Sequence, residues 1–254
     1  MKKAIVLHSF FWLLVTSMTA QQSDFQGKIE YNFDYNLNKI KKYSSDLIFN
    51  QSKSIFYWND TADQSSASKD DFGNISFDVE IKDSIGTINI TDFSKDSIVT
   101  RTLWIKGKTY LINEKIAKIN WKLLNEQKKI GNFLCSKANC SFRGRNYTVW
   151  YTNQIPLPIG PWKLQGLPGA ILEARDETGE IYFAVKKVTI PYPITVNTAT
   201  LEGEKISLKD FVAVRKELLN TIVKTFKSKL PRGVNATLDS SQENYLENSF
   251  EFEQ

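Results

Sequence analysis

Histidine is almost absent from this chain. His8 is the single histidine among 254 residues, and it lies in an apolar N-terminal segment. If that segment is removed on export, the mature protein contains no imidazole. This excludes Ser-His-Asp and Cys-His catalytic arrangements and histidine-based zinc, copper or non-haem iron sites. A general base would have to be a carboxylate, a lysine or a tyrosine. We therefore expect no metal site and no cofactor.

An excess of charge of one sign is also missing. The formal net charge of +5 includes Lys2 and Lys3, so the chain without its N-terminal segment carries +3. The lysines are spread among acidic residues and form no basic run. Because nucleic-acid binding depends on concentrated positive charge that neutralises phosphates, no nucleic-acid partner is expected.

Cysteine is scarce, with Cys135 and Cys140 as its two representatives. Two cysteines in an exported protein invite a disulfide. The surrounding segment, residues 134–142, is predicted as a strand, in which five residues span about 16 Å and the limit between bridged Cα atoms is roughly 7 Å. Regular alternation would also place the two side chains on opposite faces. A disulfide needs a bend at residues 136–139; otherwise both are small buried side chains.

Long apolar runs are confined to the N-terminus. Two lysines precede an apolar run at residues 4–15, and the small residue Ala20 precedes Gln21. This is the order of a secretory signal peptide, and the run is too short for a spanning helix. We predict a signal peptide at residues 1–20 and a single domain at 21–254, without a transmembrane segment once the signal is removed. The mature protein is expected in the periplasm or outside the cell, with outer-membrane association open.

Strand signals dominate the rest of the chain. Ile29, Tyr31, Phe33 and Tyr35 alternate with polar residues, which is the period-two pattern of a strand with one buried face. Residues 59–71 are rich in Ser, Asp and Lys and are predicted as a mobile loop. Further strands are predicted at residues 46–49, 54–58, 75–81, 87–91, 98–105, 109–113, 134–142, 147–152, 171–174 and 181–188. Hairpins with short turns indicate a mainly β fold, an antiparallel sheet curved into a half-barrel.

One helix interrupts this pattern near the C-terminus. Ser207, followed three residues later by Asp210, forms a predicted capping box. Apolar residues recur at helical spacing from Phe211 to Phe226, and Pro231 ends the pattern. Most basic residues fall on the other face. We expect a helix packed on the sheet, with a membrane-surface helix as the alternative.

The segment from Trp150 to Glu173 combines turn-forming residues with large aromatic side chains. Leu167-Pro168-Gly169 suits a type II turn, in which Gly169 takes a positive φ. Such a stiff loop either caps the sheet as a plug or presents its aromatic side chains as a preorganised contact surface. Arg143 and Arg145 lie in a predicted turn before it. We expect them to be solvated, with binding of an acidic partner as the alternative.

This segment resembles the signature of the GLPGLI family of exported Gram-negative bacterial proteins. The naming element stands here as residues 166–171, GLPGAI, with Ala170 where the family usually has leucine. The similarity extends over roughly residues 85–190 and includes Trp121, Cys135 and the run Phe142-Arg143-Gly144-Arg145, whereas Cys140 is not part of the common pattern. The family has no settled activity. The resemblance implies a binding site at Trp150, Tyr151, Gly160, Pro161, Trp162, Gly166, Leu167, Pro168 and Gly169.

Three classes of function fit these observations. The first is a non-enzymatic cell-envelope protein whose curved sheet binds an apolar ligand or docks an outer-membrane partner. The second is a hydrolase that uses Glu173 with Asp176 or Glu177 as paired carboxylates. The third is a structural or assembly protein. We expect the first.

Overall fold

The structure is a computed structural model in which the described residues are 25–37, 41–58, 67–69, 75–77, 85–104, 108–193, 201–229 and 245–253. The predicted signal peptide lies outside the described residues. So do the greater part of the loop predicted at 59–71 and residues 78–81 of the strand predicted at 75–81. Those predictions therefore stay predictions.

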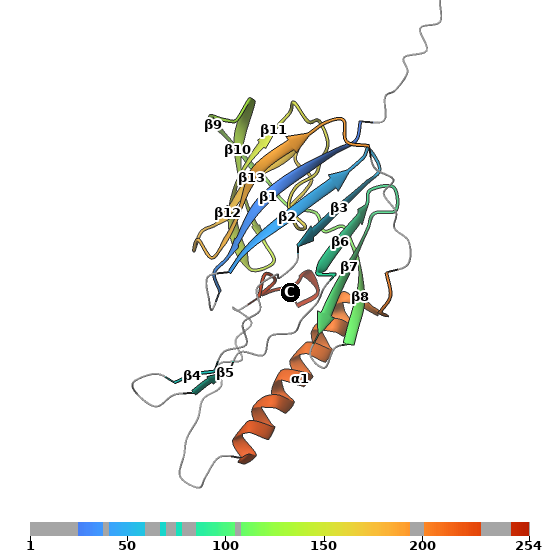
Figure 1. The fold of residues 1–254 in the computed structure, drawn as a ribbon, viewed down its shortest axis with the longest axis vertical. Coiled ribbons are helices and arrows are strands. Elements are labelled where there is room, and N and C mark those ends of the chain that lie inside the picture. Colours follow the sequence, from blue (N-terminus) through green and yellow to red (C-terminus); the bar gives the residue numbers. More distant parts are fainter. Residues whose placement is uncertain are drawn as a thin grey trace, which may run out of the picture.

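A sheet of 12 strands forms the body of the protein (Figure 1). Its strands are β1 (Gly27–Tyr35), β2 (Lys41–Phe49), β3 (Lys53–Trp58), β6 (Thr87–Asp92), β7 (Ser97–Trp104), β8 (Lys108–Lys115), β9 (Lys122–Ile130), β10 (Phe133–Phe142), β11 (Arg145–Thr152), β12 (Ala170–Asp176), β13 (Ile181–Thr189) and β14 (Glu204–Ser207). A separate pair, β4 (Ala67–Lys69) and β5 (Ile75–Phe77), forms a two-stranded sheet. The prediction of a mainly β fold is confirmed.

The strand order is β14-β8-β7-β6-β3-β2-β1-β13-β12-β11-β10-β9. Two meanders, one on each side, meet where β1 pairs with β13. Every pairing is antiparallel except that of β14 with β8, which is parallel. The expected hairpins are therefore present, but the join in the middle of the sheet depends on two strands far apart in the sequence.

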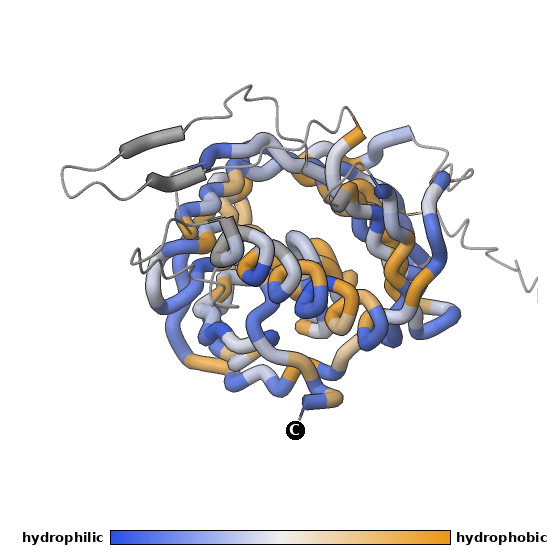
Figure 2. The backbone as a smooth tube through the Cα atoms, turned by 90° about the horizontal axis from the view of Figure 1, so that it is seen from below, coloured by the Kyte–Doolittle hydropathy of each residue, from blue (hydrophilic) through white to orange (hydrophobic). Residues whose placement is uncertain are grey.

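The sheet is curved around an interior (Figure 2). Its register shifts at three places, between Glu30 and Tyr31, between Ser136 and Ala138, and between Trp150 and Tyr151. Such bulges bend a strand and increase its twist. The extra residues lie in β13, β9 and β12, the partners of β1, β10 and β11, so the bulges help the sheet to bend around the side chains on its inner face.

Aromatic side chains fill the centre of this inner face. Phe33 of β1 stacks on Phe183 of β13 with 4.3 Å between ring centroids, and Phe56 meets Phe183 edge to face. The Tyr31 hydroxyl donates a hydrogen bond of 2.6 Å to the carbonyl oxygen of Ile171, across the intervening strand β13. Burying each such side chain stabilises the fold by about 1.5–3 kcal/mol.

The helix α1 (Leu208–Lys229) follows β14 directly. Ser207 caps it, because its Oγ accepts the Asp210 amide at 3.1 Å and donates to the Asp210 carboxylate at 2.6 Å. Leu208, Phe211 and Val212 pack with side chains of β8 and with Phe250. The later turns extend away from the sheet (Figure 1). A packed C-terminal helix is confirmed, and no helix within the described ranges has the length and apolarity needed to cross a membrane.

Cys135 and Cys140 lie in the continuous strand β10, and both are free, buried thiols. Both cysteines belong to the main hydrophobic cluster. Because β10 pairs with β11 without a register shift from Ser136 to Phe142, the prediction that the two side chains point to opposite faces stays a prediction. Burial raises the pKa of Cys135 to about 11 and that of Cys140 to about 12.

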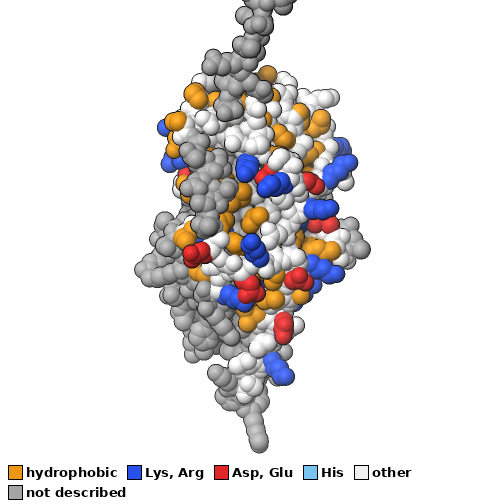
Figure 3. Space-filling view, turned by 90° about the vertical axis from the view of Figure 1, so that its right-hand side faces the viewer, with side chains coloured by type: hydrophobic (Ala, Val, Ile, Leu, Met, Phe, Trp, Pro, Cys, Tyr) orange, Lys and Arg blue, Asp and Glu red, His pale blue; other side chains and the backbone are white. Residues whose placement is uncertain are grey.

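Charge on the outside is mixed in sign. On the face shown in Figure 3, lysine and arginine side chains are interspersed with aspartate and glutamate. The chain also ends in a short segment, residues 245–253, which includes a 3₁₀ turn at Glu251–Glu253. We call residues 245–253 the C-terminal segment, because its contacts matter for the site below.

Candidate functional site

The loop at residues 153–169, here called the signature loop, joins β11 to β12 and turns inward. Its side chains Ile155, Ile159, Leu164 and Leu167 are buried in the main hydrophobic cluster. Its backbone is held as well. The Gly166 amide donates to the Pro158 carbonyl at 3.1 Å, and the Ala170 and Ile171 amides donate to Ile155 and Ile159 at 3.0 and 2.9 Å. This loop therefore fills part of the half-barrel.

Glycines in this loop are required by close packing. The prediction of a positive φ at Gly169 is wrong. The glycine of the naming element that has a positive φ is Gly166, at 94°. A Cβ at Gly169 would lie 2.1 Å from the Thr152 carbonyl oxygen, and one at Gly160 would lie 2.3 Å from the Leu164 carbonyl oxygen. Real Cβ atoms do not approach an oxygen so closely. Both glycines allow one stretch of backbone to pass another.

The three signature aromatics do not form one surface. Trp162 is buried, with its ring 5.6 Å from Phe142 between centroids, and Tyr151 is buried too. Trp150 is half-buried and alternates with its neighbours Val149 and Tyr151, which are both buried. The Lys128 ammonium lies 4.5 Å from the centre of its ring. Among the residues of the predicted binding site, Gly166 and Pro168 are exposed, and both lie in the signature loop.

Arg143 lies at the centre of a buried ion-pair network. Arg143 has a φ of 52° and Gly144 one of 82°, which together make the tight turn between β10 and β11. The guanidinium is 2% exposed and binds three carboxylates, from Glu114, Glu247 and Glu251, at 2.8, 2.9 and 2.8 Å. The expectation that this side chain is solvated is wrong, because the C-terminal segment folds over the turn and supplies two of its partners.

Lys163 of the signature loop belongs to the same network. Its ammonium is 3% exposed and binds the carboxylate of Glu114, and it binds that of Glu247 at 2.8 Å. Burial opposes the charge on Lys163, but Glu247 and Glu114 overcome this cost and raise its pKa. The pKa of Glu247 is lowered for the same reason, since Lys163 and Arg143 outweigh the effect of burial. The network thus joins β8, the turn, the signature loop and the C-terminal segment.

Arg145 is likewise buried, contrary to expectation. It binds Asp176 and Glu180, both at 2.7 Å, and donates to the Tyr245 carbonyl oxygen at 3.1 Å. Asp176 also accepts the Ile181 amide at 2.9 Å, so it holds the hairpin between β12 and β13. Both predicted turn arginines therefore do bind acidic groups, but these groups belong to the chain itself.

The carboxylates of the hydrolase hypothesis are in separate structural pairs. Glu173 binds Lys128 at 2.8 Å, Asp176 binds Arg145, and Glu177 accepts the Asn146 side-chain amide at 2.9 Å. Two carboxylates that act as acid and base need a common cleft and different environments. The structure does not bring these three carboxylates together in a common cleft.

A cavity of about 150 Å³ remains in the half-barrel interior. Four parts of the chain line it: the inner face of the sheet, the signature loop, α1 and the C-terminal segment. We call it the interior cavity. Its lining residues are Tyr35, Trp58, Thr87, Asn89, Thr100, Thr102, Ile112, Trp162, Lys163, Phe211, Arg215, Tyr245, Leu246 and Glu247. Half of these residues are aromatic or aliphatic, and the other half are three threonines, Asn89, the cations Lys163 and Arg215, and the carboxylate Glu247.

Two polar side chains of this cavity each have a buried nitrogen without a hydrogen-bond partner among the described residues. Arg215 is 5% exposed; its guanidinium lies 4.4 Å from the Tyr245 ring centre, makes no hydrogen bond or ion pair there, and has its Nη2 fully buried. Burial lowers its pKa. Asn89 is 1% exposed; its Oδ1 accepts the Thr100 hydroxyl at 2.9 Å, and its Nδ2 has no partner.

Sequence reasoning placed Arg215 on the solvated face of the helix. Its position argues otherwise, because Arg215 follows Phe211 by four residues and precedes Leu218 by three. Residues at these spacings share one face of a helix. The spacing of Arg215 within the apolar face of the helix could therefore have predicted that this arginine is buried.

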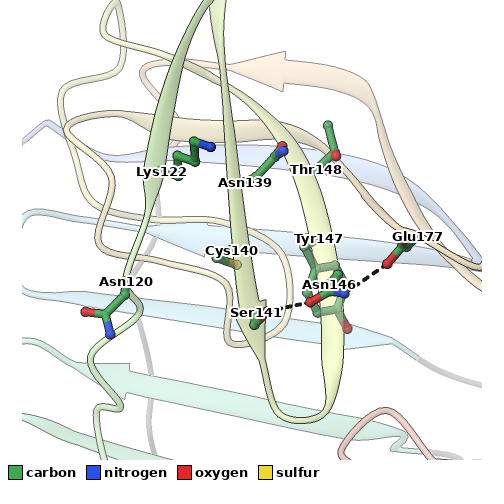
Figure 4. A pocket seen from close by; sticks show the side chains of 9 residues that line it. All are labelled: Asn120, Lys122, Asn139, Cys140, Ser141, Asn146, Tyr147, Thr148 and Glu177. Atoms are coloured by element: carbon green, nitrogen blue, oxygen red, sulfur yellow. Dashed lines mark hydrogen bonds between the residues drawn. The ribbon is translucent and has the colours of Figure 1, made fainter.

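A second hollow lies outside the sheet, next to β9, β10 and β11 (Figure 4). Its volume is about 460 Å³, and its lining is mostly polar, with Asn120, Lys122, Asn139, Ser141 and Thr148 among the members. Ser141, Asn146 and Glu177 are already linked by hydrogen bonds (Figure 4). We call it the outer hollow.

Fold and site together define a class: a mainly β protein with a plugged half-barrel and a small interior cavity. Comparisons with known proteins agree with the fold. Residues 142–173, which include the turn at Arg143 and the signature loop, match a family described as "Protein of unknown function (Porph_ging)". No curated protein matches the chain significantly.

Solved structures extend the comparison. PNGF-II, in two crystal forms, is similar over 74% of this chain at 15% and 16% identity, with TM-scores of 0.52 and 0.53. This chain spans 32% of PNGF-II, so the likeness concerns the fold of a part of that protein. The LolA superfamily protein NE2245 from Nitrosomonas europaea aligns over 71% of this chain and 91% of its own, at 9% identity and a TM-score of 0.30. That score is too low to support an inference.

Proposed function

We propose that this chain is a non-enzymatic, exported cell-envelope protein of the GLPGLI type that binds a small ligand in the interior cavity. The observation that carries the proposal is the cavity itself, which is lined by four separate parts of the chain. Binding sites are typically concave and mostly apolar, with a few placed polar groups. Trp58, Ile112 and Phe211 supply apolar wall, and Asn89 and Arg215 supply polar groups.

The size of the cavity limits the ligand. A volume of 150 Å³ lies below the roughly 300–1,000 Å³ of sites for drug-sized ligands. A long acyl chain would need the signature loop to leave, and the hydrogen bonds and buried side chains of that loop oppose this. The sequence predicts an apolar ligand, and the volume of the cavity limits that ligand to a small molecule.

Export remains part of the proposal and rests on the N-terminal sequence pattern. The same pattern supports a periplasmic or extracellular location. Docking to an outer-membrane partner is the competing function within this class, and the experiment below separates the two. A hydrolase is disfavoured by the pairing of Glu173 with Lys128 and of Asp176 with Arg145.

The test is native mass spectrometry of the mature protein purified from its own envelope fraction. Three forms are compared: the natural protein, Thr102→Leu, which fills the interior cavity, and Thr148→Leu, which changes the outer hollow in a matched way. We expect an added small mass on the natural protein and on Thr148→Leu, and its loss from Thr102→Leu.

Each other outcome counts against the proposal. A mass lost from Thr148→Leu and kept by Thr102→Leu would move the site to the outer hollow. A bound protein without a small mass would make this chain an accessory subunit. A bare natural protein would contradict ligand binding in the cavity.

A further inference from the structure

We infer that the interior cavity is a carboxylate site, in which Arg215 binds the acid group of a short ligand whose apolar end lies against the aromatic walls. This inference rests on the proposed function and deepens it, because it names the chemical class of the ligand.

The first argument is the state of Arg215. A buried guanidinium without a hydrogen-bond or ion-pair partner is costly, because its charge has lost water and gained nothing equivalent. Arg215 is 5% exposed, has no such partner within the described ranges and lines the cavity. Its contacts with the Tyr245 and Phe250 rings, at 4.4 and 5.6 Å, fix its position without neutralising it. The site lacks, among the described residues, a group that would neutralise this arginine.

The second argument is the local balance of charge. Three buried cations, Arg143, Lys163 and Arg215, face two buried carboxylates, Glu114 and Glu247. Both carboxylates are already bound by Arg143 and Lys163. Glu251 is the third partner of Arg143, so this group holds three cations and three carboxylates, and Glu253 binds Lys216 at 2.8 Å. Each of the three carboxylates is nevertheless in ion-pair contact with Arg143 or Lys163 and none with Arg215 among the described residues, so the carboxylate of a ligand would supply the contact that Arg215 lacks.

The third argument is the second unpaired donor. The Nδ2 of Asn89 is buried without a partner, while its Oδ1 is fixed by the Thr100 hydroxyl. A carboxylate has two oxygens and about four acceptor positions, so it can accept from the planar guanidinium and from an amide at once. Asn89 lies on β6 and Arg215 on α1, and both line the same cavity.

Size and lining define the rest of the ligand. At roughly 30 Å³ for each water molecule, a volume of 150 Å³ holds about five water-sized groups. Trp58, Trp162 and Phe211 supply apolar wall, and the one carboxylate of the lining, Glu247, is bound by Arg143 and Lys163. An acid with a short apolar tail, of the size of acetate to butyrate, matches both properties.

The test uses the full mature chain with sodium acetate and sodium butyrate as probes. Acetamide serves as the neutral analogue of acetate, and sodium chloride at equal ionic strength serves as the control for a simple anion. Thermal unfolding and titration calorimetry are measured for the natural protein, Arg215→Met, Arg215→Lys and the control Lys224→Met, an exposed cation on the same helix. Circular dichroism checks that each variant folds.

We expect acetate or butyrate to raise the unfolding midpoint of the natural protein and of Lys224→Met, whereas acetamide and chloride do not. Arg215→Met should bind the acids at least about tenfold more weakly, because charge-assisted hydrogen bonds are lost. Its unfolding midpoint without acid should be unchanged or higher, because an uncompensated buried charge has been removed. Arg215→Lys keeps the charge and should retain part of the binding, which covers the case in which Arg215→Met does not fold.

Equal binding of acetamide and acetate, or undiminished acid binding by Arg215→Met, overturns the inference. If the mass carried by the natural protein remains on Arg215→Met, the cavity binds a ligand without this arginine, and the proposed function stands alone. If neither the natural mass nor any probe is found in the cavity, both proposals fail.

Discussion

At the scale of single residues, the signature of this chain reflects backbone packing. Gly160 and Gly169 occur where another carbonyl oxygen occupies the space of a side chain, while Gly166 supplies a positive φ. A sequence motif that looks like a binding element can therefore be required by the fold. The same motif also places Trp162 and Lys163 against the interior cavity.

Gly169→Ala should destabilise the protein by about 3 kcal/mol or more, because the new Cβ would lie 2.1 Å from the Thr152 carbonyl oxygen. Valine would add further overlap. The matched control is Gly131→Ala, where φ is 57° and no atom lies within 4 Å of the new Cβ. That change should cost about 1 kcal/mol of backbone strain. Urea unfolding measures both, and equal costs would refute the packing argument.

The residues of the candidate site were only partly accessible from the sequence. Arg143 and Arg145 stood out, but their partners could not be deduced, because Glu247 and Glu251 follow Arg143 by about a hundred residues. Arg215 was accessible through helical spacing. Whether Arg215 has a partner depends on three-dimensional packing. Amino-acid composition and hydrophobic periodicity do not predict that.

At the scale of elements, the signature loop behaves as part of the core although it has no strand or helix. Its backbone donors reach carbonyl oxygens within the loop and at its ends, and its apolar side chains enter the main cluster. Trp121 adds a hydrogen bond of 2.9 Å from its indole nitrogen to the Gln165 carbonyl oxygen. Loops usually run over a surface because their polar backbone needs water. In the signature loop, the backbone amides of Leu157, Ile159, Leu164 and Gly166 donate to carbonyl oxygens of the loop itself.

Amide hydrogen exchange should show this directly. The Gly166 and Leu164 amides, bonded to Pro158 and Pro161, should exchange at least about a hundredfold more slowly than an exposed turn. The Lys95 amide, in the turn between β6 and β7, is the comparison, because its bond of 3.3 Å to Asp92 lies at the surface. Exchange as fast in the loop as at Lys95 would mean that the loop opens readily, and a larger ligand could then enter.

The elements that were predicted correctly are those with a local signal. Alternation and turn residues mark the strands that became β1, β10 and β13, and Ser207 with Asp210 marks the start of the helix. The strand β9 was missed because its side chains are mostly exposed and show no alternation. The register shift between β9 and β10 was missed as well, because no residue type marks a bulge reliably.

At the scale of the whole molecule, a few ion pairs join distant parts. Arg143, Lys163, Glu114 and Glu247 connect β8, the β10–β11 turn, the signature loop and the C-terminal segment. Replacing one member leaves another charge buried without its partner, which costs more than the pair contributes. The stability of the closed half-barrel should therefore depend on pH through these groups.

Glu247→Gln tests this dependence. Burial raises the pKa of Glu247, but the cations of Lys163 and Arg143 outweigh it and hold the pKa below its ordinary value of 4.5. A carboxyl group with a lowered pKa stabilises the folded state above its unfolded pKa and loses this contribution as pH falls through its folded pKa. We expect Glu247→Gln to lose roughly 3 kcal/mol at pH near 7, and this deficit should shrink as pH falls below 4.5.

Urea unfolding at a series of pH values measures the deficit. The control is Glu202→Gln, an exposed carboxylate, for which the change should stay within about 0.5 kcal/mol. A deficit that is as large in strong acid as at neutral pH would show that Glu247 acts through its shape and not through its charge.

The pairing of β1 with β13 also sets the order in which this protein can form. A chain synthesised from its N-terminus presents β1 long before β13 exists, and the Tyr31 hydroxyl must wait for a carbonyl 140 residues later. Contacts between distant segments slow folding, because loop closure costs entropy before the contact stabilises anything. Until then β1 and β2 form a hairpin with an unpaired edge, which favours association with other chains. This protein should therefore fold late and slowly, and its closure waits for the last residues of the C-terminal segment to reach Arg143.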